Sequence, residues 1–289
     1  MTTLSITSPT DGQLKQVRRF AEDAVDRAIR EGKLTRDRIQ RLIEKGDEFQ
    51  EDIADSIFRH TSPDQFLFEE VESRYRYSAY HEPKGIAEQI KILRQLFPGI
   101  GFPEICRSKL PSNAEGWFAI PRWQVVAETY GKAVQKVLEL IKKTREGKFH
   151  NLREGQFGPK YLCVSVRSIQ ALEKIEEEQG GRDILVIPAQ FGFRHAGRSV
   201  RRALEVMGAD EFGLGAFAVG IMLLTHPERL GQECDDLWID CAGDELSLLG
   251  NDKFFGTPCF GYENSMVHFS AGSFGDAKGH YGSASGFLI

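Results

Sequence analysis

The sequence lacks a segment long enough to cross a membrane. Its longest apolar run covers residues 212–224, which is 13 residues, whereas a transmembrane helix needs about 20. The first residues are polar and contain no basic region followed by an apolar core, so the sequence predicts no secretory signal peptide. We therefore expect a soluble, cytoplasmic protein without a membrane partner, in which residues 212–224 form a buried helix.

Paired cysteines and histidine motifs for metals are also missing. The five cysteines are odd in number and scattered, no CxxC pair occurs, and none of the seven histidines belongs to HExxH. This pattern favours free thiols in a reducing compartment and argues against a structural zinc site.

The signatures of common nucleotide-binding and hydrolytic folds are incomplete. No G-x-x-x-x-G-K-[ST] loop occurs. Residues 197–201 begin like the nucleophile elbow G-x-S-x-G but end in arginine, where the sharp turn needs a small residue. Residues 213–220 resemble G-x-G-x-x-G only superficially, because their third glycine comes too late. The sequence therefore leaves open whether the protein is an enzyme.

Basic residues are scarce in the last part of the chain. Residues 203–289 hold three lysines and arginines against 13 acidic residues, whereas residues 1–202 hold 34 against 29. Such an asymmetry is typical of a nucleic-acid-binding face or of internal charge complementarity.

Hydrophobic periodicity predicts a mainly helical region over residues 1–148. Apolar residues at three- and four-residue steps predict helices over 17–29, 35–57, 84–96 and 121–146, with a bend or break at Gly46. Residues 98–120 are rich in glycine and proline, and we expect an irregular connection there.

The pattern changes after residue 148. Residues 184–187 and 237–239 read as buried strands, while 165–178, 197–207 and 211–224 read as helices. The Gly- and aromatic-rich segment 253–289 favours short strands. We predict an α+β or α/β fold, with a helical N-terminal part followed by a mixed sheet with packed helices in residues 149–289. The two regions can also form one continuous domain.

Residues 181–208 hold the densest group of arginines in the chain. A buried strand, a glycine-containing loop and a helix can present free backbone N–H groups to an anion. The cations of this segment are the candidate ligand-binding residues: Arg194, His195, Arg198, Arg201 and Arg202. Positive charge in the first turn opposes the helix dipole, so a negative partner is expected nearby.

Three partners for these cations stay open at this stage. The first is a small ligand that carries a phosphate or carboxylate, with Arg194, Arg198 and Arg202 stabilising charge if the protein is an enzyme. The second is the backbone of a nucleic acid or ribonucleoprotein, without catalysis. The third is internal: the carboxylates of residues 203–289, or a charged contact that joins the two halves of the chain.

A second candidate is the segment DDLWIDCAGDE, residues 235–245. Asp240 and Asp244 are candidate acid–base groups, and Cys241 is a candidate nucleophile. Asp240, Asp244 and Glu245 follow a predicted buried strand and could hold Mg²⁺ beside a bound phosphate. In the alternative interpretation Asp240 caps the turn or pairs with an arginine.

Four segments, "FAIPRWQ", "DILVIPAQFGFRHAGRSVRRA", "EFGLGAFAVGIMLLTHPERL" and "LWIDCAGDE", together resemble stretches in a family of uncharacterised bacterial hypothetical proteins of similar length. The resemblance would span about residues 118–289. It implies a bacterial, cytoplasmic protein and a single unit over that range. It implies no activity, cofactor or catalytic residue, and the sequence predicts no oligomeric state.

Overall fold

The structure, a computed structural model, describes residues 10–61, 66, 68–103, 109–231, 236–248, 250, 251 and 253–289. The chain divides into two compact units, residues 1–65 and 66–289. The division therefore lies well before the boundary at 148/149 that the change of pattern indicates. Helices between residues 86 and 144 belong to the second unit because they pack on its sheets.

The first unit consists of three helices, α1 (Asp11–Arg30), α2 (Arg36–Glu44) and α3 (Gly46–Thr61). The helix predicted over 17–29 is confirmed, and the pattern over 35–57 is split at Lys45, next to the expected break. Among the residues of this unit whose burial is described, none is buried.

The second unit contains a four-stranded antiparallel sheet in the order β1-β4-β11-β5. Its strands are β1 (Gly116–Pro121), β4 (Ile184–Gln190), β5 (Glu211–Gly213) and β11 (Ser285–Phe287). Every residue of β4 is buried, as its continuous apolar run predicts. The prediction of an irregular connection over 98–120 is wrong for the last residues of that range, which form β1 and pair along the whole of its length with β4. Trp117, Phe118 and Ile120 are residues that favour a strand.

A seven-stranded mixed sheet follows the order β10-β6-β8-β7-β3, with β9 pairing with both β8 and β2. Its strands are β2 (Phe149–Asn151), β3 (Leu162–Val164), β6 (Trp238–Asp240), β7 (Asp244–Leu246), β8 (Gly256–Glu263), β9 (Met266–Ser273) and β10 (Tyr281–Ser283). The short strands predicted for the C-terminal segment are therefore confirmed. The chain passes from this sheet to the four-stranded sheet at Ala284, which lies between β10 and β11.

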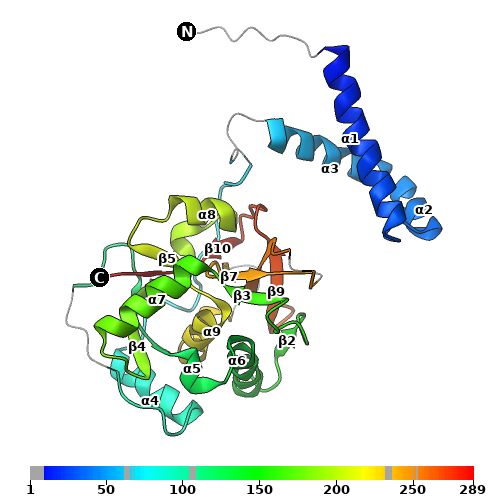
Figure 1. Cartoon of the computed structure of the whole chain (residues 1–289). Helices are drawn as coiled ribbons and strands as arrows, with labels where there is room; N and C mark the ends of the chain where they lie inside the picture. Colours follow the sequence, from blue (N-terminus) through cyan, green and yellow to red (C-terminus); the bar gives the residue numbers. More distant parts are fainter. Residues whose placement is uncertain are drawn as a thin grey trace, which may run out of the picture. The chain divides into compact units, whose positions relative to one another are not determined.

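Helices cover and connect the two sheets. They are α4 (Ile86–Leu96), α5 (Trp123–Val126), α6 (Tyr130–Thr144), α7 (Val166–Glu178), α8 (Val200–Val206) and α9 (Ala216–Thr225). Figure 1 shows α6 and α9 side by side, and every residue of α9 is buried. The apolar run at 212–224 thus forms a core helix, but its first residues belong to β5, and the helix begins only at Ala216.

These elements form an α+β fold with a helical N-terminal part. Among the described residues, no helix combines the length and the apolar character needed to cross a membrane. The three described cysteines, Cys163, Cys241 and Cys259, are free thiols, while Cys106 and Cys234 lie outside the described residues.

Candidate functional site

The arginine stretch, residues 190–202, has the predicted strand–loop–helix architecture. Strand β4 ends at Gln190, a single 3₁₀ turn covers Phe193–His195, and α8 begins at Val200. Gly192 adopts φ of 120° and lies against the carbonyl of Gly282, so that a Cβ atom there would come within 2.5 Å of the carbonyl oxygen. Only glycine fits this turn, which brings the arginines next to β10.

Two of the candidate residues, Arg194 and His195, converge on one buried carboxylate, Glu211 of β5. His195 Nε2 lies 2.8 Å from Glu211 Oε1, and Arg194 Nε lies 3.2 Å from Oε2. Ser285 also donates to Oε1, at 2.6 Å. Although burial raises the pKa of Glu211, the hydrogen bonds from His195 and Ser285 and the charge of Arg194 bring it below its ordinary value. The Glu211 carboxylate is therefore ionised, and both of its oxygens have side-chain partners.

The other three cations pair with two adjacent glutamates at the start of the second unit. Arg201 forms an ion pair with buried Glu69, which also accepts a 2.6 Å hydrogen bond from the Ser199 hydroxyl. Arg198 and Arg202 share Glu70, at 3.2 and 2.6 Å. The hydrogen bond from Arg202 is the main reason why the pKa of Glu70 is lowered.

The backbone donors of the loop are occupied as well. Every N–H from residue 191 to residue 199 donates to an acceptor of the chain itself, including the Gln190 and Glu115 side chains, the Tyr77 hydroxyl and the carbonyls of Glu69 and Tyr281. The Ser199 hydroxyl caps α8 by accepting from the N–H of Arg202. The loop therefore presents no row of free N–H groups to an anion.

These contacts fasten residues 69–71 to the arginine stretch. Besides the ion pairs, the N–H of Val71 donates to the Gly197 carbonyl, and the N–H of Ser199 donates to the Glu69 carbonyl. Of the three glutamates, only Glu211 belongs to the acidic segment 203–289. The other two lie before α4, in the first half of the chain, although the sequence does not single them out as the partners.

Asp240, at the end of β6, lies in a row of small polar side chains across the seven-stranded sheet. Its register partners are Cys259 on β8 and Ser283 on β10. Burial raises the pKa of Asp240 to about 7, although the charge of Lys278 acts in the opposite direction. Burial also raises the pKa of the Cys259 thiol, so this thiol is not a ready nucleophile.

Asp244, on β7, has different surroundings from Asp240. Both of its carboxylate oxygens accept from the Tyr130 hydroxyl, at 2.7 and 2.8 Å, and one also accepts from the N–H of Ala216 at the start of α9, at 2.7 Å. Burial nevertheless raises the pKa of Asp244 to about 7. The carboxylate is thus held as a structural link between α6, α9 and β7.

The carboxylates predicted to hold magnesium do not form a metal site, and the predicted nucleophile is not activated. Glu245 follows Asp244 on β7, so the two side chains lie on opposite faces of the strand. Within the part of the chain that the structure describes, no group of three or more His, Cys, Asp or Glu side chains could hold a metal ion. Burial raises the pKa of Cys241 well above its ordinary value, which leaves the thiol protonated.

A hollow lined mainly by hydrophobic side chains, here called the apolar cleft, lies near these groups and has a volume of about 390 Å³. Its lining comes from the end of β1, the start of β4, strand β3, the starts of α6 and α9, and helices α5 and α7. Its lining includes Ile120, Trp123, Tyr130, Leu162, Cys163, Val164, Ile169, Leu172, Leu185, Phe217 and Ala218. The edge of Trp123 packs on Tyr130, with ring centroids 6.1 Å apart.

Few polar residues line this cleft, and one of them, Arg122, has a buried donor without a partner. Arg122 lines the cleft and forms an ion pair with Glu176, yet its buried Nε–H has no hydrogen-bond acceptor. Glu173 also lines the cleft. Burial is the main reason why the pKa of the Cys163 thiol is raised to about 11. The thiol therefore stays uncharged at neutral pH and contributes an apolar surface to the cleft.

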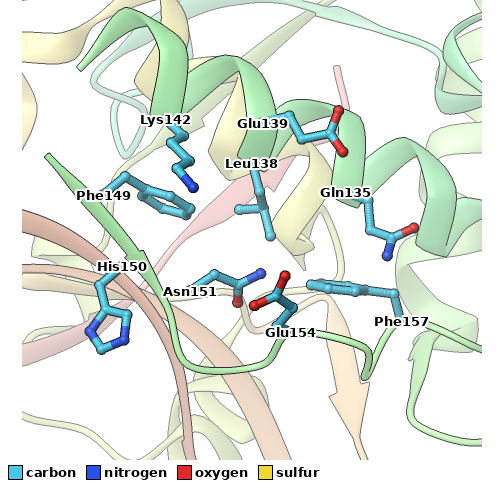
Figure 2. A pocket seen from close by; sticks show the side chains of 9 residues that line it. All are labelled: Gln135, Leu138, Glu139, Lys142, Phe149, His150, Asn151, Glu154 and Phe157. Atoms are coloured by element: carbon cyan, nitrogen blue, oxygen red, sulfur yellow. The ribbon is translucent and has the colours of Figure 1, made fainter. Parts of the chain in front are cut away.

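A second cleft, of about 290 Å³, lies between α6 and the segment that begins with β2. Figure 2 shows Leu138 and Lys142 on α6, and Phe149, Glu154 and Phe157 on the segment that faces it. Both of these charged side chains are exposed to solvent. The apolar cleft is larger and better shielded from water, so it is the stronger candidate for a ligand site.

No family model, curated protein or solved structure matches this chain. The resemblance to a bacterial family therefore stays a prediction.

Three residues of the apolar cleft, Arg122, Trp123 and Tyr130, were not candidates in the sequence. The apolar strand residues before Arg122 and the aromatic residue after it are the only local signal. A single arginine in such a context has no distinctive spacing, whereas the cluster at 194–202 attracts attention although all its members are paired.

Proposed function

We propose that the protein binds a small, mainly apolar and uncharged molecule with an oxygen acceptor in the apolar cleft. The observation that carries the proposal is a cleft lined mainly by hydrophobic side chains, among whose lining residues Arg122 has a buried Nε–H without an acceptor. A buried donor without a partner is costly, so a ligand oxygen that accepts from it gains affinity.

The charges at the cleft favour a neutral ligand over an anion. Arg122 is already compensated by Glu176, and its Nη2 also lies 3.8 Å from Asp183. Glu173 adds further negative charge. A carboxylate or phosphate would therefore meet net repulsion, whereas a ketone, ester or amide oxygen would not.

The arginine stretch is not included in this proposal, although an anionic ligand there stays a prediction of the sequence. An anion would have to displace glutamates that are buried or shared between two arginines. The same glutamates are unfavourable to a nucleic-acid backbone, since they place negative charge among the cations.

The first test is a titration with the neutral fluorescent probe N-phenyl-1-naphthylamine. We expect saturable binding by the wild type. Leu172→Trp, which fills the cleft from α7, should weaken binding at least roughly tenfold, equivalent to about 1.4 kcal/mol. Leu140→Trp is the matched control, because Leu140 is also a half-buried leucine of a helix but does not line the cleft. Equal affinities for the two variants would refute the site.

The second test concerns the oxygen acceptor. In competition with the probe, 2-acetylnaphthalene should bind more tightly than 2-ethylnaphthalene, because a hydrogen bond from a charged donor contributes about 1.5–3 kcal/mol. Arg122→Met should abolish this preference, while Lys174→Met, which removes an exposed cation outside the cleft, should preserve it. A preference that survives Arg122→Met would exclude this arginine as the donor.

A further inference from the structure

Polar atoms without a hydrogen-bond partner gather in one part of the core of the second unit. Among the residues that the structure describes, seven buried polar side-chain atoms have no partner. Four of the seven belong to three residues: the hydroxyl of Tyr80, Oε2 of Glu115, and Nε and Nη1 of Arg229. Buried polar groups are normally hydrogen-bonded, so such a concentration calls for a shared partner.

The three residues surround one small region, because each of them contacts both Tyr77 and Phe191. The ring centroid of Tyr80 lies 5.6 Å from that of Tyr77 and 5.2 Å from that of Phe191. Glu115 Oε1 accepts from the Tyr77 hydroxyl at 2.7 Å and from the N–H of Phe191 at 3.2 Å. The guanidinium carbon of Arg229 lies 3.9 and 5.5 Å from the centres of the same two rings.

Arg229 is a buried cation that touches no carboxylate in the described part of the chain. Its side chain is fully buried, and its Nη2 donates to the Leu237 carbonyl at 2.9 Å. Burial raises the pKa of Glu115, and the hydrogen bond from Tyr77 and the charge of Arg229 offset only part of this effect. Arg229 and Glu115 therefore influence each other electrostatically without forming a direct ion pair.

These groups fit a small neutral molecule that both donates and accepts hydrogen bonds. Arg229 can only donate, the Glu115 carboxylate accepts, and the Tyr80 hydroxyl can do either. An anion would be repelled by Glu115 and a cation by Arg229. Water accepts and donates, and a buried water molecule typically makes about three hydrogen bonds to groups of this kind.

We propose that Arg229, Glu115 and Tyr80 form a binding site for ordered water in the core, and that this water joins Arg229 to Glu115. The site is independent of the apolar cleft. It explains how the protein keeps a fully buried arginine that has no direct carboxylate contact, because a water-mediated hydrogen bond is nearly as favourable in enthalpy as a direct one.

The water site also supports the beginning of the arginine stretch. Glu115 directly precedes β1 and holds the N–H of Phe191, while the Tyr77 hydroxyl accepts from the N–H of Phe193 at 2.8 Å. Arg229 ends a single 3₁₀ turn that follows α9. The site thus connects the edge of the four-stranded sheet, the end of α9 and the loop that leads to the arginines.

The direct test is a high-resolution crystal structure of the full chain. We expect an isolated density peak at about 2.7–3.2 Å from Oε2 of Glu115 and from a guanidinium nitrogen of Arg229. A direct ion pair between these two side chains, or no density at this place, would overturn the proposal. Crystals grown with bromide give a further check, since an anomalous signal at the peak would identify a halide instead of water.

Tyr80→Phe tests the site in solution, because it removes only the hydroxyl and keeps the ring. If the hydroxyl binds water, the variant should increase the equilibrium constant of unfolding in urea roughly three- to tenfold. Tyr161→Phe is the matched control, since Tyr161 is half-buried and lies outside this cluster, and it should change the constant by less than roughly twofold. Equal or greater stability of Tyr80→Phe would show that the hydroxyl has no partner and would also overturn the proposal.

Discussion

In the arginine stretch every arginine has a carboxylate partner, whereas Arg122, which lines the apolar cleft, has a buried donor without an acceptor. The arginine stretch is rich in charge, and its charged groups find their partners within the protein. The apolar cleft is poor in charge, and one buried hydrogen-bond donor of its lining residues has no acceptor. Binding capacity follows the unsatisfied groups rather than the density of charged residues.

The largest expected effect is on stability, at the centre of the arginine stretch. Glu211→Ala removes a buried carboxylate and leaves His195 and Arg194 without their partner, so we expect a loss of about 3–5 kcal/mol in the free energy of unfolding. Urea denaturation at pH 7 measures this loss. Glu205→Ala on the exposed side of α8 is the control and should change stability by less than about 0.5 kcal/mol. A small effect of Glu211→Ala would mean that the network is not integral to the fold.

The two regions should differ in the sign of their pH dependence. Asp244, behind the cleft, has a folded-state pKa of about 7, above the ordinary 3.8. Its contribution to stability is present at low pH and is lost as the pH rises from about 4 to 7, by up to about 4 kcal/mol. Asp244→Asn cannot titrate, so its stability relative to the wild type should increase over this interval and stay constant above it.

Glu211 should show the opposite behaviour, because its pKa is lowered in the folded state. Its contribution is present above the ordinary pKa of 4.5 and is lost as the pH falls through the lower folded-state value. Glu211→Gln should therefore be most destabilising near neutral pH and less so in acid. Urea denaturation from pH 3.5 to pH 8 measures the stability of both variants relative to the wild type. If the two stability differences changed in the same direction with pH, the two regions would not differ in their pH dependence.

A smaller effect is expected where the cleft meets α9. A Cβ atom at Gly215 would contact the carboxylate of Asp244 and the hydroxyl of Tyr130. Gly215 has φ of −83°, which any residue can adopt, so Gly215→Ala tests space rather than backbone freedom. We expect a loss of about 1–3 kcal/mol in thermal or urea unfolding, as for other overpacked sites. Unchanged stability would show that Asp244 can move away freely.

The smallest effect is expected at the exposed rim of the arginine stretch. Arg198 is partly exposed and shares Glu70 with Arg202, so Arg198→Ala should cost about 0–1 kcal/mol. It should also leave any effect of phosphate on the melting temperature unchanged. A phosphate-dependent stabilisation that disappears in Arg198→Ala would instead support an anion site at the arginine stretch.

The parts of the fold that were predictable have a strong local signal. Strand β4 and the core of α9 follow from uninterrupted apolar runs, and α6 and α7 follow from their periodicity. Strand β1 was missed because the glycines and prolines before it dominate the local pattern. The break between α5 and α6 was missed because Thr129, which caps α6, lies within an apparently continuous helical pattern.

The partners of the arginines could not be predicted, because ion pairing depends on the tertiary fold. Glu70 lies 128 residues before Arg198 in the chain. Asp240 and Asp244 are close in sequence, but a turn and two strands give them separate neighbours. The sequence could therefore identify that the arginines need negative charge, but not which residues supply it.

The most direct test of the contrast is a side-by-side titration of two related probes, neutral N-phenyl-1-naphthylamine and its anionic analogue 8-anilino-1-naphthalenesulfonate. We expect the wild type and Arg198→Ala to bind the neutral probe equally and more tightly than the anion, and Leu172→Trp to lose this binding. Tighter binding of the anion that is lost in Arg198→Ala and retained in Leu172→Trp would contradict it.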